Sequence, residues 1–450
     1  MDPHHPPEGG RPRVSVITRR IRAAAETTPG RYRLWSLATA VLLLATGVAG
    51  WAAATALRSG TDRIRNNAGP VLVATQQLVS SLAEADAAAT AAFLSGRQED
   101  PESRRLYEQA LARASQQIED VSALIGADPA THDSLKDLSV AVIRYAGLVE
   151  AARATNQAGV AGAERYLVDA LNLLATTLAD DATRLTAATQ RRFERDEDRR
   201  DTGVLPAVAV AALALAVLVA AQLWVFRQSR RLLNLPMVVA TVLLVGGIGW
   251  LAAVTLRSGN DIEQARVNGY DSITLTSRIQ TTAYRSKADE TVALITGDQA
   301  RRARATETAE VVLGDRATPA VVDAVRDGRV PGVAGLLTDA AAVADSDRER
   351  AAVAEMLVRW QRYQDTSAQL RATTDPAQAR AVAVGPASAT FNGFNFSVES
   401  VLSDNRSQFL DGLASSARRL RSLDLVALFL PLAAAAAAVS GFQLRIKEYP

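Results

Sequence analysis

The sequence predicts an all-α membrane protein with four transmembrane helices and two tandem extracytoplasmic antiparallel four-helix bundles. One observation is a repeat: residues 50–60 read GWAAATALRSG and recur as GWLAAVTLRSG at 249–259, which indicates a tandem duplication. The other is that each half begins and ends with an apolar run free of charged residues. Runs of about 20 residues are long enough to cross the ~30 Å hydrocarbon core of a bilayer as helices.

The apolar runs divide the chain into nine segments. We expect spans at 34–57, 204–226, 235–256 and 425–444. The segments between paired spans, 58–203 and 257–424, are predicted bundles, since Ala, Leu, Arg, Gln and Glu dominate them and β-branched runs are absent. What remains is a basic tail at 1–33 with too little apolar content to fold, a loop at 227–234 and a tail at 445–450.

Arginine and lysine in the short segments predict the orientation. The tail before the first span, the link Arg227-Gln228-Ser229-Arg230-Arg231 and the C-terminal Arg445 and Lys447 are basic, and short cytoplasmic loops carry such an excess. We therefore expect a multi-pass protein of the cell membrane with both termini in the cytoplasm. Arginines also precede the second and fourth spans, but long domains translocate largely regardless of charge.

Breaker residues divide the first bundle into four helices. They are Gly96 to Pro101, Gly126 to Pro129 and Gln157 to Gly159, and a kink is expected at Gly69-Pro70. Short turns between such helices favour an up-down-up-down bundle.

The second bundle repeats the first. Arg362-Tyr363 and Arg371 match Arg144-Tyr145 and Arg153 at a constant offset of 218 residues, and 288–297 aligns with 87–96. An insertion rich in Gly and Pro is expected at 314–333, with irregular helix near Gly269 and Gly385-Pro386.

Composition argues against enzymatic chemistry. The chain has no Cys and only three His, of which His4 and His5 lie in the tail and His132 in a predicted loop. Thiolate nucleophiles and Cys-based metal sites are thereby excluded, and we expect no catalytic residues, no cofactor and no metal. The apolar runs contain no Asp, Glu, Lys or Arg, which argues against an ion pathway or transporter.

Two carboxylates stand out on the helix seams. Asp86 and Asp289 fall at apolar seam positions, where a carboxylate costs stability unless it is paired. Each could face a ligand or an arginine such as Arg144 or Arg362, or a shift of register could leave it in solvent. The Arg144-Tyr145 and Arg362-Tyr363 pairs could hold an anionic ligand, because arginine forks suit carboxylates, or could form structural bonds between helices.

The repeated Leu-Arg-Ser-Gly sequence stands where the first and third spans leave the membrane. It could act as a hinge between span and bundle, or its arginine could fix the depth of the span together with Trp51 and Trp250. The candidate hinge residues are Arg58, Ser59, Gly60, Arg257, Ser258 and Gly259.

A helical bundle between two spans resembles the sensor domains of bacterial chemoreceptors and sensor kinases. The departure from that family is the short stub 445–450 after the last span, so that a signal would have to pass to a separate protein. The two span-bundle-span units, the repeated Leu-Arg-Ser-Gly, the basic N-terminus and the stub are together similar to the actinobacterial GlnX-type membrane sensors.

That resemblance implies partners on both sides of the lipid bilayer. Outside it implies an amino-acid-binding lipoprotein, and inside the soluble serine/threonine protein kinase G, joined by a non-enzymatic signal relay. It identifies no ligand-binding residues. The residues leave open a direct small-molecule receptor or a structural envelope protein, whose bundles could form a homodimer. The formal charge of +2 gives no reason to expect nucleic acid.

Overall fold

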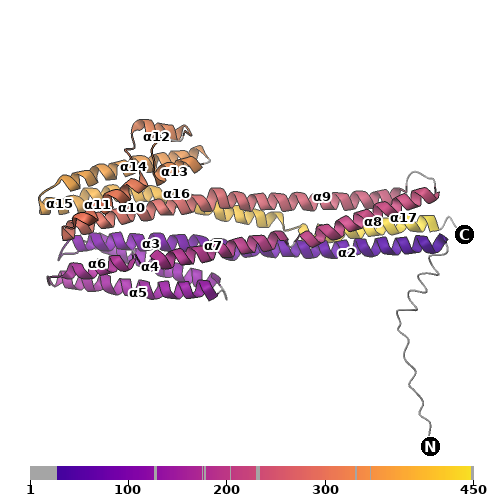
Figure 1. Cartoon of the computed structure of the whole chain (residues 1–450), viewed down its shortest axis with the longest axis horizontal. Coiled ribbons are helices and arrows are strands. Elements are labelled where there is room, and N and C mark those ends of the chain that lie inside the picture. The colour runs from indigo at the N-terminus through magenta and orange to yellow at the C-terminus, as the bar shows by residue number, and fades with distance from the viewer. Residues whose placement is uncertain are drawn as a thin grey trace, which may run out of the picture. The chain divides into compact units, whose positions relative to one another are not determined.

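The chain is almost entirely helical in a computed structural model (Figure 1). The structure describes residues 28–125, 129–174, 176, 179–202, 204–229, 234–329, 332–344 and 346–446. Within these residues no strand occurs, so the all-α class is confirmed. The predictions for residues 1–27, 230–233 and 447–450 lie outside the described residues.

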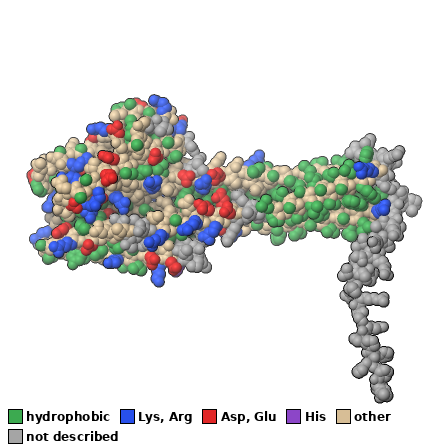
Figure 2. Space-filling model, viewed as in Figure 1, with side chains coloured by type: hydrophobic (Ala, Val, Ile, Leu, Met, Phe, Trp, Pro, Cys, Tyr) green, Lys and Arg blue, Asp and Glu red, His purple; other side chains and the backbone are tan. Residues whose placement is uncertain are grey.

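Four helices form one compact unit, drawn from residues 1–61, 198–259 and 417–450. They are α2 (Thr28–Arg63), α8 (Leu205–Ser229), α9 (Leu235–Gln264) and α17 (Leu423–Ile446). Each contains a stretch long and apolar enough to cross a membrane. Large apolar side chains cover the outside of this unit (Figure 2), with Leu235 71% and Leu37 64% exposed. Such a surface suits a hydrocarbon environment, and the side of the bilayer that each end faces stays a prediction.

Inside this membrane unit, small residues and polar side chains join the helices. Gly47 and Gly50 of α2 face α17, where a Cβ on Gly50 would make an ordinary van der Waals contact of 3.4 Å with the carbonyl oxygen of Ala427. Gln222 Nε2 of α8 donates to the carbonyl of Met237 on α9 at 2.8 Å. These contacts hold the four helices together.

The remaining helices form a second compact unit, drawn from residues 62–197 and 260–416. Its first half contains η1 (Ile64–Ala68), α3 (Gly69–Leu94), α4 (Pro101–Ile125), α5 (Pro129–Gln157), α6 (Ala163–Leu173) and α7 (Ala179–Thr202). Its second half contains η3 (Ala265–Tyr270), α10 (Asp271–Thr296), α11 (Gln299–Val312), α12 (Pro319–Arg326), α13 (Leu336–Val343), α14 (Asp347–Ala372), α15 (Pro376–Val382), η4 (Ala383–Ala387) and α16 (Ser388–Arg419).

The expected kinks are π-helical segments. η1, η3 and η4 lie next to or across Gly69-Pro70, Gly269 and Gly385-Pro386, so that each helix continues with a local widening instead of breaking. Pro70 lies directly after η1, and this change of hydrogen-bond pattern accommodates a residue that has no amide hydrogen inside a continuous helix.

The two halves of this unit share one hydrophobic cluster, and the first half has a second cluster of its own. α3 packs directly against α10, and Ile64 and Leu72 of the first half lie in the same buried cluster as Ile273 and Trp360 of the second. Gly269 permits a close approach, because a Cβ there would lie 2.8 Å from the Cβ of Phe409. The division into two four-helix bundles stays a prediction, and within one compact unit the repeated segments pack against each other along α3 and α10.

Candidate functional site

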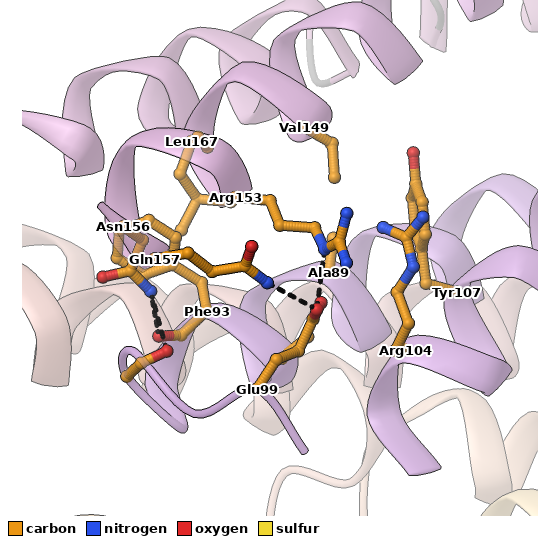
Figure 3. Close-up of a pocket in the computed structure, with 13 residues that line it drawn as sticks. Ala89, Phe93, Glu99, Arg104, Tyr107, Val149, Arg153, Asn156, Gln157 and Leu167 are labelled. Carbon is orange, nitrogen blue, oxygen red and sulfur yellow. Dashed lines mark hydrogen bonds and ion pairs between the residues drawn. The ribbon is translucent and has the colours of Figure 1, made fainter. Parts of the chain in front are cut away.

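A pocket opens in the first half of the second unit (Figure 3). The space it encloses is about 20 Å³, enough for one water molecule, and the rest of the hollow is open to solvent. Its apolar wall consists of Ala89, Ala92, Phe93, Val149, Ala152 and Leu167. Its polar wall consists of Glu99, Arg104, Tyr107, Arg153, Asn156 and Gln157.

Short side chains and a turn create the space. Ala89 and Ala92 face it from the alanine-rich last turns of α3, which ends before Gly96. Gly96 has φ of 85°, a conformation that glycine adopts without strain. The chain then turns back to bring Glu99 to the mouth before α4 begins at Pro101. Two helices and the turn between them thus shape one side of the pocket.

Two arginines from neighbouring helices carry the charge of the site. Arg153 Nε of α5 donates to Glu99 at 2.6 Å, and this hydrogen bond raises the pKa of Arg153. Arg104 Nη1 of α4 lies 2.6 Å from Glu150, which also pairs with Arg153 at 3.3 Å. In Figure 3 the Arg153 side chain extends toward Arg104 between Glu99 and Val149. Because Glu150 serves both guanidinium groups, a change at one arginine affects the other.

The end of α5 is fastened to the end of α3. Asn156 Nδ2 donates to the carbonyls of Phe93 at 3.1 Å and Gly96 at 3.2 Å, which satisfies carbonyl groups left free where a helix ends. Gln157 Nε2 donates to Glu99 at 3.2 Å (Figure 3). These bonds fix the mouth of the pocket.

Tyr107 supplies a buried hydroxyl to the wall. Its ring is 2% exposed, and the Arg104 guanidinium lies 5.4 Å from the ring centroid. Within the described residues the hydroxyl has no hydrogen-bond partner. Burial raises the pKa of Tyr107 to about 12, so it remains a neutral donor at physiological pH. A buried donor without a protein partner costs free energy unless a water or a ligand accepts its hydrogen bond.

The structure places Asp86 next to Tyr145 and away from Arg144. Asp86 is 6% exposed and accepts a hydrogen bond of 3.4 Å from Tyr145 Oη. Burial, followed by the charge of Asp289, raises the pKa of Asp86 to about 7. Arg144 is exposed on the other side of α5. Asp86 is therefore buried and paired within the core, and its partner is the tyrosine of the predicted Arg-Tyr pair.

In the second half the buried carboxylate is Glu290 rather than Asp289. Tyr363 Oη donates to Glu290 at 3.3 Å, while Asp289 lies 3.2 Å from Arg301 of α11. Arg362 is exposed, as Arg144 is. Burial raises the pKa of Glu290, and its hydrogen bond from Ser367 opposes this shift. Asp289 thus faces an arginine, one of the two possibilities left open by the sequence, but the arginine is Arg301 and not Arg362.

The Leu-Arg-Ser-Gly sequences lie inside helices of the membrane unit. α2 continues through Gly60 to Arg63, and α9 through Gly259 to Gln264, so helical geometry is kept at both. Arg58 forms an ion pair with Asp424 at the start of α17, whereas Arg257 is exposed and Ser258 is buried. Ser59 is exposed and bonds to the carbonyl of Ala56. The hinge role stays a prediction.

Residues 60–198 match the family model of the actinobacterial sensor domain. This range contains every residue that lines the pocket. None of the curated proteins compared matches the chain. The match covers only part of the chain, and it supports an actinobacterial sensor protein with a role in sensing or signalling. The candidate pocket thus lies in the segment that is similar to known sensor domains.

Most of the residues that form this pocket were not predicted from the sequence. Glu99, Arg104, Tyr107, Asn156 and Gln157 come from a turn and two helices, and no spacing pattern connects them. The one available signal was the recurrence of Arg153 as Arg371.

Proposed function

We propose that this chain is a non-enzymatic transmembrane relay that couples an extracytoplasmic amino-acid-binding protein to a cytoplasmic serine/threonine kinase. The observation that carries the proposal is the place of the sensor-like segment in the chain. Residues 60–198 lie between two candidate membrane spans. The first of these spans belongs to an uninterrupted helical stretch from Gly30 to Leu94, which reaches into the wall of the pocket.

Helix continuity supplies a route for the signal. A partner that shifts α3 against α4 would displace the helix that contains the first span, because a helix transmits axial and rotational displacement better than a loop. η1 is a point at which such a displacement could be absorbed or amplified, since π-helical segments are frequent at functional sites. In this proposal the loops rich in arginine face the cytoplasm and contact the kinase.

The pocket favours a second function, that of a direct small-molecule receptor. A cavity with an apolar wall, two arginines and a buried hydroxyl without a partner has the composition of a ligand site. A receptor and a relay are compatible, because a bound ligand could set the response to the partner protein.

Orientation can be tested with single cysteines, because the chain has none. Asp137→Cys and Asp327→Cys place a thiol at exposed positions of the first and second halves. A membrane-impermeant maleimide should label both variants in intact cells. If the variants are labelled only after the cells are lysed, the predicted orientation is wrong and the relay is refuted.

Coupling to a kinase can be tested in the host cell. Addition of amino acids to the medium should change phosphorylation of serine/threonine kinase substrates in the wild type. The response should be lost when the gene is deleted and restored by the full chain. An unchanged response in the deletion strain would refute the coupling.

A further inference from the structure

The second half contains a counterpart of the pocket region. The stretch 288–297 aligns with 87–96, and both end in a glycine with positive φ, 85° at Gly96 and 71° at Gly297. Glu290 of α10 therefore occupies the position of Ala89 on α3. Along α14 and α5, Arg371 corresponds to Arg153 by the constant offset of the repeat.

Side chains of the protein itself fill this counterpart. Glu290 is 8% exposed and accepts hydrogen bonds from Arg371 Nη1 at 3.0 Å, from Tyr363 Oη at 3.3 Å and from Ser367 Oγ. Leu370 also occupies the position that corresponds to the smaller Ala152. The Glu290 carboxylate of α10 thus neutralises Arg371 on the facing helix α14.

The first half has alanine where that carboxylate stands. Ala89 lines the pocket, and its side chain ends at Cβ. The carboxylates that pair with Arg153 come instead from the turn before α4 and from α5 itself. Glu99 is well covered, with a side chain 14% exposed, whereas Glu150 is 45% exposed and can turn into solvent. The pocket therefore has the arginine but no carboxylate on α3, and a ligand would use the space that Glu150 leaves.

From this comparison we infer that the pocket binds a small ligand that carries a carboxylate. The ligand carboxylate pairs with Arg153 as the Glu290 carboxylate pairs with Arg371. Glu150 moves away from Arg153 when the ligand binds. The apolar part of the ligand lies on Ala92 and Phe93. This inference deepens the receptor function proposed above and rests on it.

The surrounding charges favour a carboxylate over a phosphate. Glu99, Glu108 and Glu150 pair with only two arginines at this end of the unit, so a dianion would meet repulsion. A planar carboxylate also matches the fork of a guanidinium group. Tyr107 adds a buried donor to the wall. An ammonium group on the ligand would be compatible with Glu99, and the test below separates ligands with and without one.

The test measures binding to the full-length chain in nanodiscs by isothermal titration calorimetry. The probes are butyrate and 2-aminobutyrate, with neutral butyramide as the control ligand. We expect saturable binding of at least one of the two carboxylates and none of butyramide. If neither carboxylate binds, or if butyramide binds equally well, the inference is overturned.

Variants locate the binding. Ala89→Glu restores the internal carboxylate of the second half and should abolish binding. Arg153→Gln should weaken it by about tenfold or more, since a charge-assisted hydrogen bond is lost. Arg144→Gln, on an exposed part of α5, is the matched control and should bind as the wild type does. If a folded Arg153→Gln variant binds the ligand as tightly as the wild type does, the inference is overturned, even if Ala89→Glu fails to fold. If butyramide binds as well as the carboxylates, the receptor function stands and only the carboxylate inference fails, so the two failures are distinguishable.

Discussion

Replacing Glu290 with alanine removes the buried carboxylate that joins α10 to α14. Arg371, Tyr363 and Ser367 then lose a common acceptor. Breaking a buried ion pair costs about 3–5 kcal/mol when the remaining charge stays buried. The Arg371 side chain is 29% exposed, so water can replace part of the lost bonding. We therefore expect a loss of about 2–4 kcal/mol in the free energy of unfolding.

The loss can be measured as a thermal midpoint of the full chain in detergent, followed by circular dichroism. For a unit of this size we expect the midpoint of Glu290→Ala to fall by roughly 4–10 °C. Glu355→Ala is the control, because it removes a half-exposed partner of Arg359 and should cost only about 0–1 kcal/mol. The contrast separates a buried acceptor from a surface ion pair.

Acetate tests whether the vacated space accepts a carboxylate. The measurement is made in an Arg153→Gln background, so that the first-half pocket contributes no response. Acetate should raise the midpoint of Glu290→Ala more than that of its parent. A destabilisation by Glu290→Ala below about 1 kcal/mol, the level of a surface pair, would refute the structural reasoning. Equal effects of acetate on variant and parent would show that the space does not accept a carboxylate.

Two further predictions concern stability. The pKa of Asp86 is raised, so the folded state holds this proton more tightly than the unfolded state, and stability falls as pH rises from about 4 to about 7. Asp86→Asn, which keeps the size of the side chain, should be more stable than the wild type at pH above about 7 and equal to it near about 4, measured by midpoint against pH. Gly269→Ala should cost about 1–3 kcal/mol, because its Cβ would meet Phe409. Gly147→Ala, in open space on α5, should instead gain about 0.5–1 kcal/mol, and a denaturant titration of both glycine variants measures the two changes.

The fold class and the membrane segments could be predicted because their signals are local. An uninterrupted apolar run determines its own environment, and breaker residues mark where a helix must change. The breakers at Gly69-Pro70 and Gly269 showed where the helices deviate, but not that they would become π-helical. The hydrophobic cluster shared by the two halves could not be predicted from the sequence, because an apolar seam on α3 does not specify that α10 will cover it.

The site was predicted less well for a geometric reason. Arg144 and Tyr145 are neighbours on one helix, so their side chains point about 100° apart, and only one of them can face α3. The burial of Asp86 followed from its seam position, but its partner depends on how α5 is rotated. The pocket depends on the short side chain of Ala89. A single alanine forms no recognisable sequence pattern, and it becomes informative only when it is compared with Glu290 at the equivalent position of the repeat.

The two halves differ in how freely their arginines can exchange partners. Arg371 is bound to a carboxylate that is itself buried, and separating the two would leave a charge without compensation. Arg153 is held by Glu99 and by the half-exposed Glu150, and water can solvate Glu150 when it leaves. Exchange of Glu150 for a ligand carboxylate is therefore nearly balanced in charge and bonding, which is what reversible sensing requires.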